Sequence, residues 1–111
     1  MATESLGVVR VARQVLLAII TNVTVEIPGV TRMAQGSDTW SRLPGRTIPR
    51  NGVALAIKEN TISADLYIVV APGVNIVEVG STIQEEVASA IEEMVGMRVQ
   101  EVNVYIQDVA E

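Results

Sequence analysis

The residues best suited to chemistry in this sequence are three arginines in one short segment, "DTWSRLPGRTIPRNG", at residues 38–52. Arg42, Arg46 and Arg50 recur at every fourth position beside Trp40, the only tryptophan of the chain, and no acidic residue occurs from position 39 to position 58. Guanidinium groups bind phosphates, carboxylates and anionic lipid headgroups. The segment is therefore a candidate contact for an anionic partner. Equally, the arginines could pair with the chain's own carboxylates while the tryptophan packs under the loop.

The side chains that most often carry out catalysis are missing. The chain has no Cys and no His, and its only lysine is Lys58. Without them, Ser and Thr lack an activating base, and thiolate or imidazole metal sites are excluded. No pair of carboxylates is placed for acid–base work, and no glycine-rich phosphate loop occurs. We expect no enzymatic activity, no cofactor and no metal ion.

Acidic residues concentrate in the second half of the chain. Residues 1–50 carry a formal charge of +3 and residues 51–111 carry −8, for a net charge of −5. Five glutamates fall within one candidate helix: Glu78, Glu85, Glu86, Glu92 and Glu93. A solvated helix face explains them, although an acidic docking face or a hard-cation site would also use such residues. The total charge disfavours general nucleic-acid binding.

Length and composition indicate one domain that associates with itself. The chain has 111 residues, 49% of them hydrophobic, and no Phe. A surplus of aliphatic residues in so small a domain is typical of a homo-oligomer. The first residues lack the pattern of a secretory signal, and the longest apolar run, "VLLAII", is far shorter than a transmembrane segment. We expect a cytoplasmic protein whose membrane contact, where it has one, is peripheral.

Hydrophobic periodicity predicts an α+β fold. Residues 12–26 step by three and four as a helix does, and the segment from 76 to 94 has one apolar stripe, with Asn75 as its cap and Gly96 beyond its end. Alternating or β-branched segments predict strands at 6–11, 30–35 and 99–109 and a hairpin over 52–70, with an irregular loop at about 36–49. The order predicts a two-layer sandwich: a mixed sheet of about five strands with two helices on one face.

The second face of the predicted sheet offers a candidate self-association surface. On the strand at 61–71 the outward residues become apolar toward the end, and Tyr67, Val69 and Tyr105 project from this face by alternation. One interpretation is a face that is only partly shielded. The other is a subunit interface formed by these three residues.

Several landmarks together resemble the alkaline shock protein family, also called the Gls-type envelope stress response family. "VEIPGV" (25–30) resembles its E-x-P-G-V element, and "GVNIVEVGSTIQEEVASAIEEMVGMRVQEVNVYIQDV" (73–109) resembles its closing block. That block begins with G-x-x-I, continues as a helix ending in M-x-G-[LM]-x-V, and closes on V-N-V-x-[IV]. One departure is Pro72-Gly73, where many members carry Tyr-Gly.

The resemblance implies a small cytoplasmic protein without catalytic residues, tied to envelope stress and envelope homeostasis. It also implies peripheral placement at the inner face of the membrane through a membrane-anchored protein partner. The alternative that it suggests is a regulatory binding module for enzymes of fatty-acid or lipid metabolism.

Overall fold

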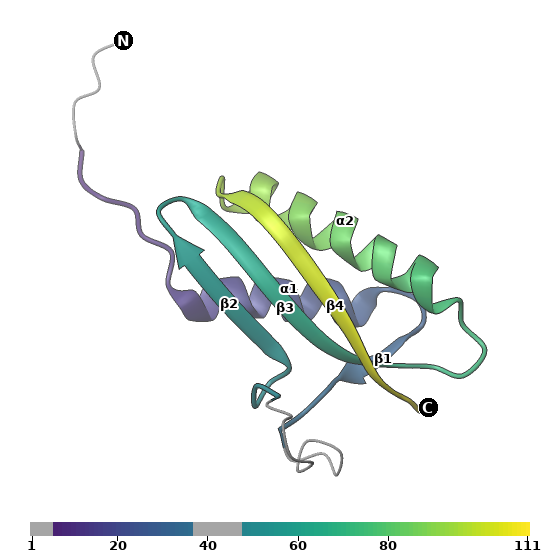
Figure 1. Ribbon diagram of the computed structural model, residues 1–111. Helices are drawn as coiled ribbons and strands as arrows, with labels where there is room; N and C mark the ends of the chain where they lie inside the picture. The colour runs from purple at the N-terminus through teal and green to yellow at the C-terminus, as the bar shows by residue number, and fades with distance from the viewer. Residues whose placement is uncertain (1–5, 37–47) are drawn as a thin grey trace.

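The protein is an α+β sandwich in which two helices cover one face of a mixed sheet (Figure 1). The computed structural model describes residues 6–36 and 48–111. In these ranges the elements follow the order α1 (Arg13–Glu26), β1 (Val30–Met33), β2 (Val53–Lys58), β3 (Thr61–Val70), α2 (Ile76–Met94) and β4 (Arg98–Val109). The predicted fold class, the mixed sheet and the two helices on one face are confirmed.

The central strand of the sheet is β3, which pairs with all three other strands. β4 runs parallel to it from Thr61 to Val70 and occupies one of its edges. β1 and β2 are both antiparallel to β3 and share its other edge, with β2 opposite 61–66 and β1 opposite 68–70. The partner strand therefore changes at Tyr67, the residue between the two pairings.

The core lies between the helices and the inner face of β3. Alternate residues of this strand are buried, and α2 contributes one side chain per turn. The buried residues of β3 and the two helices in this cluster are Ile62, Ala64, Leu66, Ile68 and Val70 with Leu16, Ile20, Val79, Ile83, Val87 and Ile91. Fully burying one such aliphatic side chain contributes about 1.5–3 kcal/mol, so this layer contact accounts for most of the attraction between helices and sheet.

The helix ends follow the local chemistry that the sequence predicts. α1 ends because Ile27, which precedes Pro28, adopts an extended conformation. At the start of α2 the Asn75 side chain accepts the Glu78 backbone N–H at 3.0 Å. Beyond its end Gly96 has φ +77°, the left-handed conformation that closes a helix.

One predicted strand is absent. Residues 6–12 carry no regular secondary structure, and within the described ranges the sheet has four strands rather than about five. The alternating residues of the segment favour an extended chain, but a strand also needs a neighbour for its backbone groups. No hydrogen bond among the described residues joins 6–11 to the sheet.

Gly52 is required by the close approach of three backbone segments. It has φ +78°, and a Cβ there would lie 2.6 Å from the Ala34 carbonyl oxygen and 2.9 Å from that of Tyr67. We expect Gly52→Ala to lower the free energy of unfolding by at least about 2 kcal/mol, because it adds backbone strain to a clash. Urea unfolding followed by circular dichroism measures the change.

The matched control is Gly80→Ala. Gly80 lies inside α2, where an added Cβ meets nothing within 4 Å. Alanine should there raise stability by about 0.5–1 kcal/mol through helix propensity. Equal urea midpoints for Gly52→Ala and Gly80→Ala would contradict the requirement for glycine at position 52.

Candidate interaction surface on the open face of the sheet

The face of the sheet opposite the helices has no covering element among the described residues (Figure 1). The parallel register of β3 and β4 places Tyr67 beside Tyr105 on this face. Their rings stack with centroids 4.9 Å apart and planes inclined by 18°. Tyr105 is 41% exposed, so the stack presents a flat aromatic surface to the outside.

A polar network adjoins the tyrosines. The Asn103 side-chain amide donates to a carboxylate oxygen of Asp65 and to one of Glu101, both at 2.9 Å. One amide group thus holds two carboxylates side by side on the surface. Carboxylates held by hydrogen bonds keep a fixed position, so the open face combines an aromatic patch with a rigid acidic patch.

The environment of the tyrosine pair raises the pKa of Tyr67 above its ordinary value. Partial burial is the main cause, because it disfavours the charged phenolate, and the negative charge of Asp65 adds to it. The neighbouring Tyr105 contributes a smaller effect in the same direction. The phenol of Tyr67 is therefore neutral at physiological pH and can donate a hydrogen bond to a partner.

Both ends of the segment that contains the three arginines return to this region. The Tyr67 N–H donates to the Gly52 carbonyl at 2.8 Å, and the Ala34 N–H donates to the Tyr67 carbonyl at 2.8 Å. Nearer to the loop, the Gly36 N–H donates to the Arg50 carbonyl at 3.3 Å. Arg50 is exposed. The backbone of Tyr67 is thus bonded to the described residues on both sides of 37–47, a connection that the sequence does not reveal.

The other predicted contacts have different outcomes. Trp40, Arg42 and Arg46 lie outside the described residues. Val69 projects outward by alternation as predicted, yet it is fully buried, so it offers no surface to a partner. Of the three residues predicted for the self-association surface, Tyr67 and Tyr105 remain accessible.

The glutamates of α2 do not form a metal site. All five are exposed, and two of them accept hydrogen bonds from the protein, Glu92 from the Val99 N–H and Glu93 from the Ser89 hydroxyl. In the ranges that the structure describes, no group of three or more His, Cys, Asp or Glu side chains could hold a metal ion.

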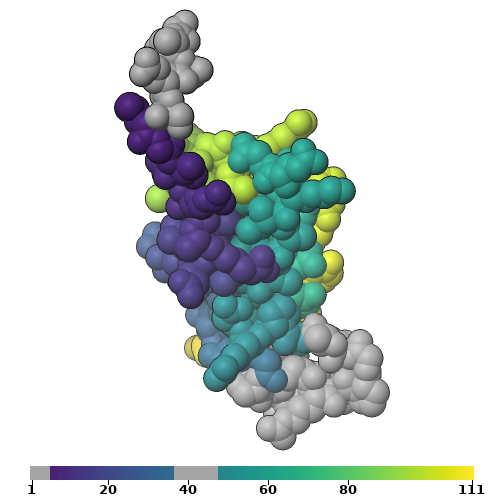
Figure 2. Space-filling view, turned by 90° about the vertical axis from the view of Figure 1, so that its left-hand side faces the viewer, coloured from purple at the N-terminus to yellow at the C-terminus, as the bar shows by residue number. Residues whose placement is uncertain are grey.

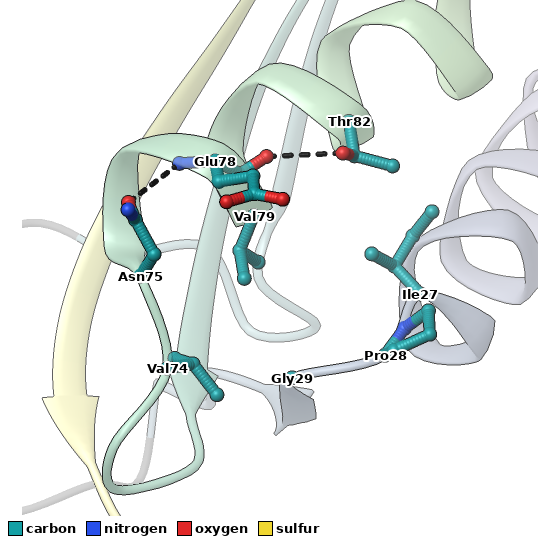
Figure 3. A pocket seen from close by; sticks show the side chains of 8 residues that line it. All are labelled: Ile27, Pro28, Gly29, Val74, Asn75, Glu78, Val79 and Thr82. Carbon is teal, nitrogen blue, oxygen red and sulfur yellow. Dashed lines mark hydrogen bonds between the residues drawn. The ribbon is translucent and has the colours of Figure 1, made fainter.

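An open cleft of about 470 Å³ lies between the end of α1 and the start of α2 (Figure 3). Two of its polar side chains form hydrogen bonds within α2. Asn75 caps this helix, and the Thr82 hydroxyl donates to the Glu78 carbonyl at 3.0 Å. A Cβ at Gly29 would approach Val79 to 2.9 Å. The E-x-P-G-V element and the G-x-x-I element therefore meet here as packing elements that join the two helices.

The bridging role of Asn103 was not predicted from the sequence. Alternation placed Asn103 and Asp65 on the outward face, but their contact depends on the register between β3 and β4, which has an irregularity between Ile62 and Ser63. An irregularity of this kind shifts the pairing by one residue. The outward asparagine flanked by alternating valines, "VNV", was the available signal.

The chain belongs to the alkaline shock protein 23 family, whose model is described by a cell envelope-related function and matches residues 1–111. The family identified from the sequence motifs is thereby confirmed. The uncharacterised protein Spy1614 of Streptococcus pyogenes is 32% identical over 106 residues, covering 93% of this chain and 88% of the relative. The uncharacterised protein YloU of Bacillus subtilis is 26% identical with the same coverage.

Solved structures of similar fold include those of the MamM CTD. One variant has a TM-score of 0.56 at 19% identity and covers 90% of this chain and all of its own, 100%. Another has a TM-score of 0.54 at 19% identity, covering 88% and 95%. At this identity the likeness concerns the fold alone. No helix within the described ranges is long and apolar enough to cross a membrane.

Removing the charge of Asp65 should lower the raised pKa of Tyr67 toward the ordinary tyrosine value. We expect Asp65→Asn to do so, with burial keeping the pKa above about 10. Because the folded-state pKa exceeds the unfolded one, stability in the wild type falls as pH rises from about 10 to the folded-state pKa. A pH titration of tyrosinate absorbance measures the shift.

Tyr67→Phe is the control for that titration, since it should remove the high-pH part of the absorbance change. If the titration curve of Asp65→Asn coincides with that of the wild type, the charge of Asp65 does not raise the pKa of Tyr67.

Proposed function

We propose that this protein works without catalysis, as a self-associating component of the envelope stress response or of envelope homeostasis. It acts as one domain over residues 1–111, through protein contacts at the inner face of the membrane. A membrane-anchored protein partner holds it there. The observation that carries the proposal is the open sheet face with its stacked Tyr67–Tyr105 pair, in a family of cell envelope-related function.

The aromatic pair is suited to bind a second copy. Tyrosine is enriched in protein interfaces, because its ring buries a large area while its hydroxyl keeps a hydrogen bond. In a two-fold symmetric contact the same patch faces itself, so two stacked pairs would meet at the dimer axis. The ordered amide of Asn103 and its carboxylates would then form the polar rim.

The arginine segment is suited to bind the anionic partner. Its described end, Arg50, is exposed and lies two residues before Gly52, whose carbonyl accepts the Tyr67 N–H. An acidic segment of the membrane-anchored protein, or the anionic membrane surface beside it, would complement the positive charge of the three arginines. This division leaves the acidic helix α2 directed away from the membrane.

Tyr105→Glu should weaken self-association. The substitution places a charge in the centre of the proposed contact, near Glu101 and Asp65, where it would have to be desolvated beside like charges. We expect the dissociation constant to rise at least tenfold, measured by sedimentation equilibrium over a concentration series. Tyr105→Phe keeps the ring and is the matched control, expected to associate as the wild type does.

If a folded Tyr105→Glu protein associates as strongly as the wild type, self-association does not use this face.

Recruitment to the envelope is tested by fractionation of native cells at low salt. We expect the protein to be recovered with membranes and to be released as salt rises, because exposed charge contacts are screened. Replacing Arg42, Arg46 and Arg50 together by Gln should move it to the soluble fraction. Replacing all three by Lys keeps the charge and should retain most of the membrane-bound protein.

Recovery of the wild type in a soluble complex with an enzyme of lipid synthesis would instead favour the regulatory-module alternative. A third outcome, co-purification with RNA and a salt-dependent affinity that falls with the same three substitutions, would favour nucleic-acid binding.

A further inference from the structure

The segment 6–12, "LGVVRVA", which we call the N-terminal arm, has the composition of a strand but pairs with no strand among the described residues. Leu6 is 99% exposed, Val9 95% and Val8 73%. β-branched residues favour the extended conformation, and exposed aliphatic side chains gain when they are removed from water. The arm therefore combines a strand-forming sequence with apolar surface that lacks cover.

The outer edge of β2 has backbone groups available for one more strand. Even-numbered residues of β2 face β3, as the bond between the preceding Gly52 and Tyr67 indicates. The backbone groups of Val53, Leu55 and Ile57 therefore point away from β3. Among the described residues, the N–H groups of Leu55 and Ile57 have no hydrogen-bond partner.

This edge carries little protection against another strand. Proteins commonly guard exposed edges with charged residues, prolines or bulges. In "VALAIK" the only charge is the terminal Lys58, and the register with β3 is regular throughout. One side chain covers part of the edge, since the Arg13 guanidinium donates to the Leu55 carbonyl at 2.6 Å.

The hydrogen bond between Arg13 and Leu55 places the end of the arm that joins α1 at this edge. Arg13 is the first residue of α1, so the arm leaves the body opposite the middle of β2. Figure 2, which views the molecule from the β2 side, shows the arm in dark purple continuing upward from α1, to the left of the teal strands. Seven residues of extended chain reach about 23 Å, slightly more than the roughly 20 Å length of a six-residue strand.

We propose that the N-terminal arm adds as a strand to the outer edge of β2 in a second copy of this chain, so that two copies exchange arms. An arm that starts opposite Leu55 can follow at most half of its own β2, whereas it can cover the whole edge of a second copy. This inference rests on the proposed self-association and specifies one contact by which two copies associate. Exchange of a terminal segment is a known way of forming dimers at low cost.

The added strand would satisfy the Leu55 and Ile57 N–H groups and cover the exposed valines of the arm. Two-fold symmetry makes every contact occur twice. The arm contact uses the edge of the sheet, while the tyrosine contact uses its open face, so the two are separable by experiment.

Cysteine cross-linking tests the pairing directly, because the chain contains no cysteine of its own. Chains carrying Ala54→Cys or Ala56→Cys are mixed with chains carrying Val8→Cys or Val9→Cys and then oxidised. A disulfide between two different single-cysteine chains is necessarily intermolecular. Ala54 and Ala56 lie on one face of the sheet and adjacent arm residues project to opposite faces.

We therefore expect one of the two arm variants to give several-fold more mixed disulfide than the other. Equal yields would indicate random collisions of a free arm and would overturn the proposal, as would the absence of any mixed disulfide.

Deletion of residues 1–11 gives the second measurement. The exposed residues 6–11 make no backbone bond to the sheet among those described, so the truncated chain should fold, which circular dichroism checks. We expect its dissociation constant, by sedimentation equilibrium, to be at least tenfold higher than that of the full chain. Val9→Ile keeps an apolar strand former and should not change it.

Unchanged association after deletion, with loss in Tyr105→Glu, would overturn the arm exchange and leave the proposed function in place. A full chain that stays monomeric at all concentrations would overturn both the exchange and the proposed self-association.

Discussion

The backbone hydrogen bonds of β3 determine where the other described strands lie. This strand pairs with β4 along one whole edge and with β2 and β1 in succession along the other. At the change of partner, the N–H of Tyr67 bonds to Gly52 and its carbonyl to Ala34. Every other strand is positioned through β3, so its register also determines which side chains meet on the open face.

The two faces of β3 differ in burial and in chemistry. Its inward residues are buried against α1 and α2, and no chemistry is available there beyond packing. From Thr61 to Tyr67 the outward residues are polar or aromatic and meet those of β4, which yields the Tyr67–Tyr105 stack and the Asn103 bridge. An exposed aromatic pair beside hydrogen-bonded carboxylates is the kind of surface on which the proposed protein contact would rest.

The sequence predicted what depends on local chemistry. Asn75 caps α2 because its side chain reaches an N–H three residues on, and Pro28 ends α1 by restricting the residue before it. Alternation identified the hairpin and the outward tyrosines. It could not predict that Tyr105 lies beside Tyr67, because that depends on the register of two strands separated by a helix.

Alternation also failed where a neighbouring strand was needed. Residues 6–11 have the pattern of a strand, yet a strand exists only where another backbone completes its hydrogen bonds. Similarly, Val69 alternates outward but is fully buried, a property that depends on tertiary contacts at the end of β3. Both features depend on interactions between segments distant in sequence.

The hydrogen bond between the Arg13 guanidinium and the Leu55 carbonyl partly blocks the outer edge of β2. Arg13 directly follows the arm in the sequence. A guanidinium covers one carbonyl of the edge while leaving the neighbouring N–H groups exposed. An incoming strand must displace this charge-assisted bond but gains several backbone bonds and apolar cover in return. The edge of an isolated chain is thus partly protected against indiscriminate pairing, and a partner strand must supply enough contacts to replace Arg13. A second copy meets this condition because its arm is long enough to follow all of β2, which a shorter or more polar segment would not do.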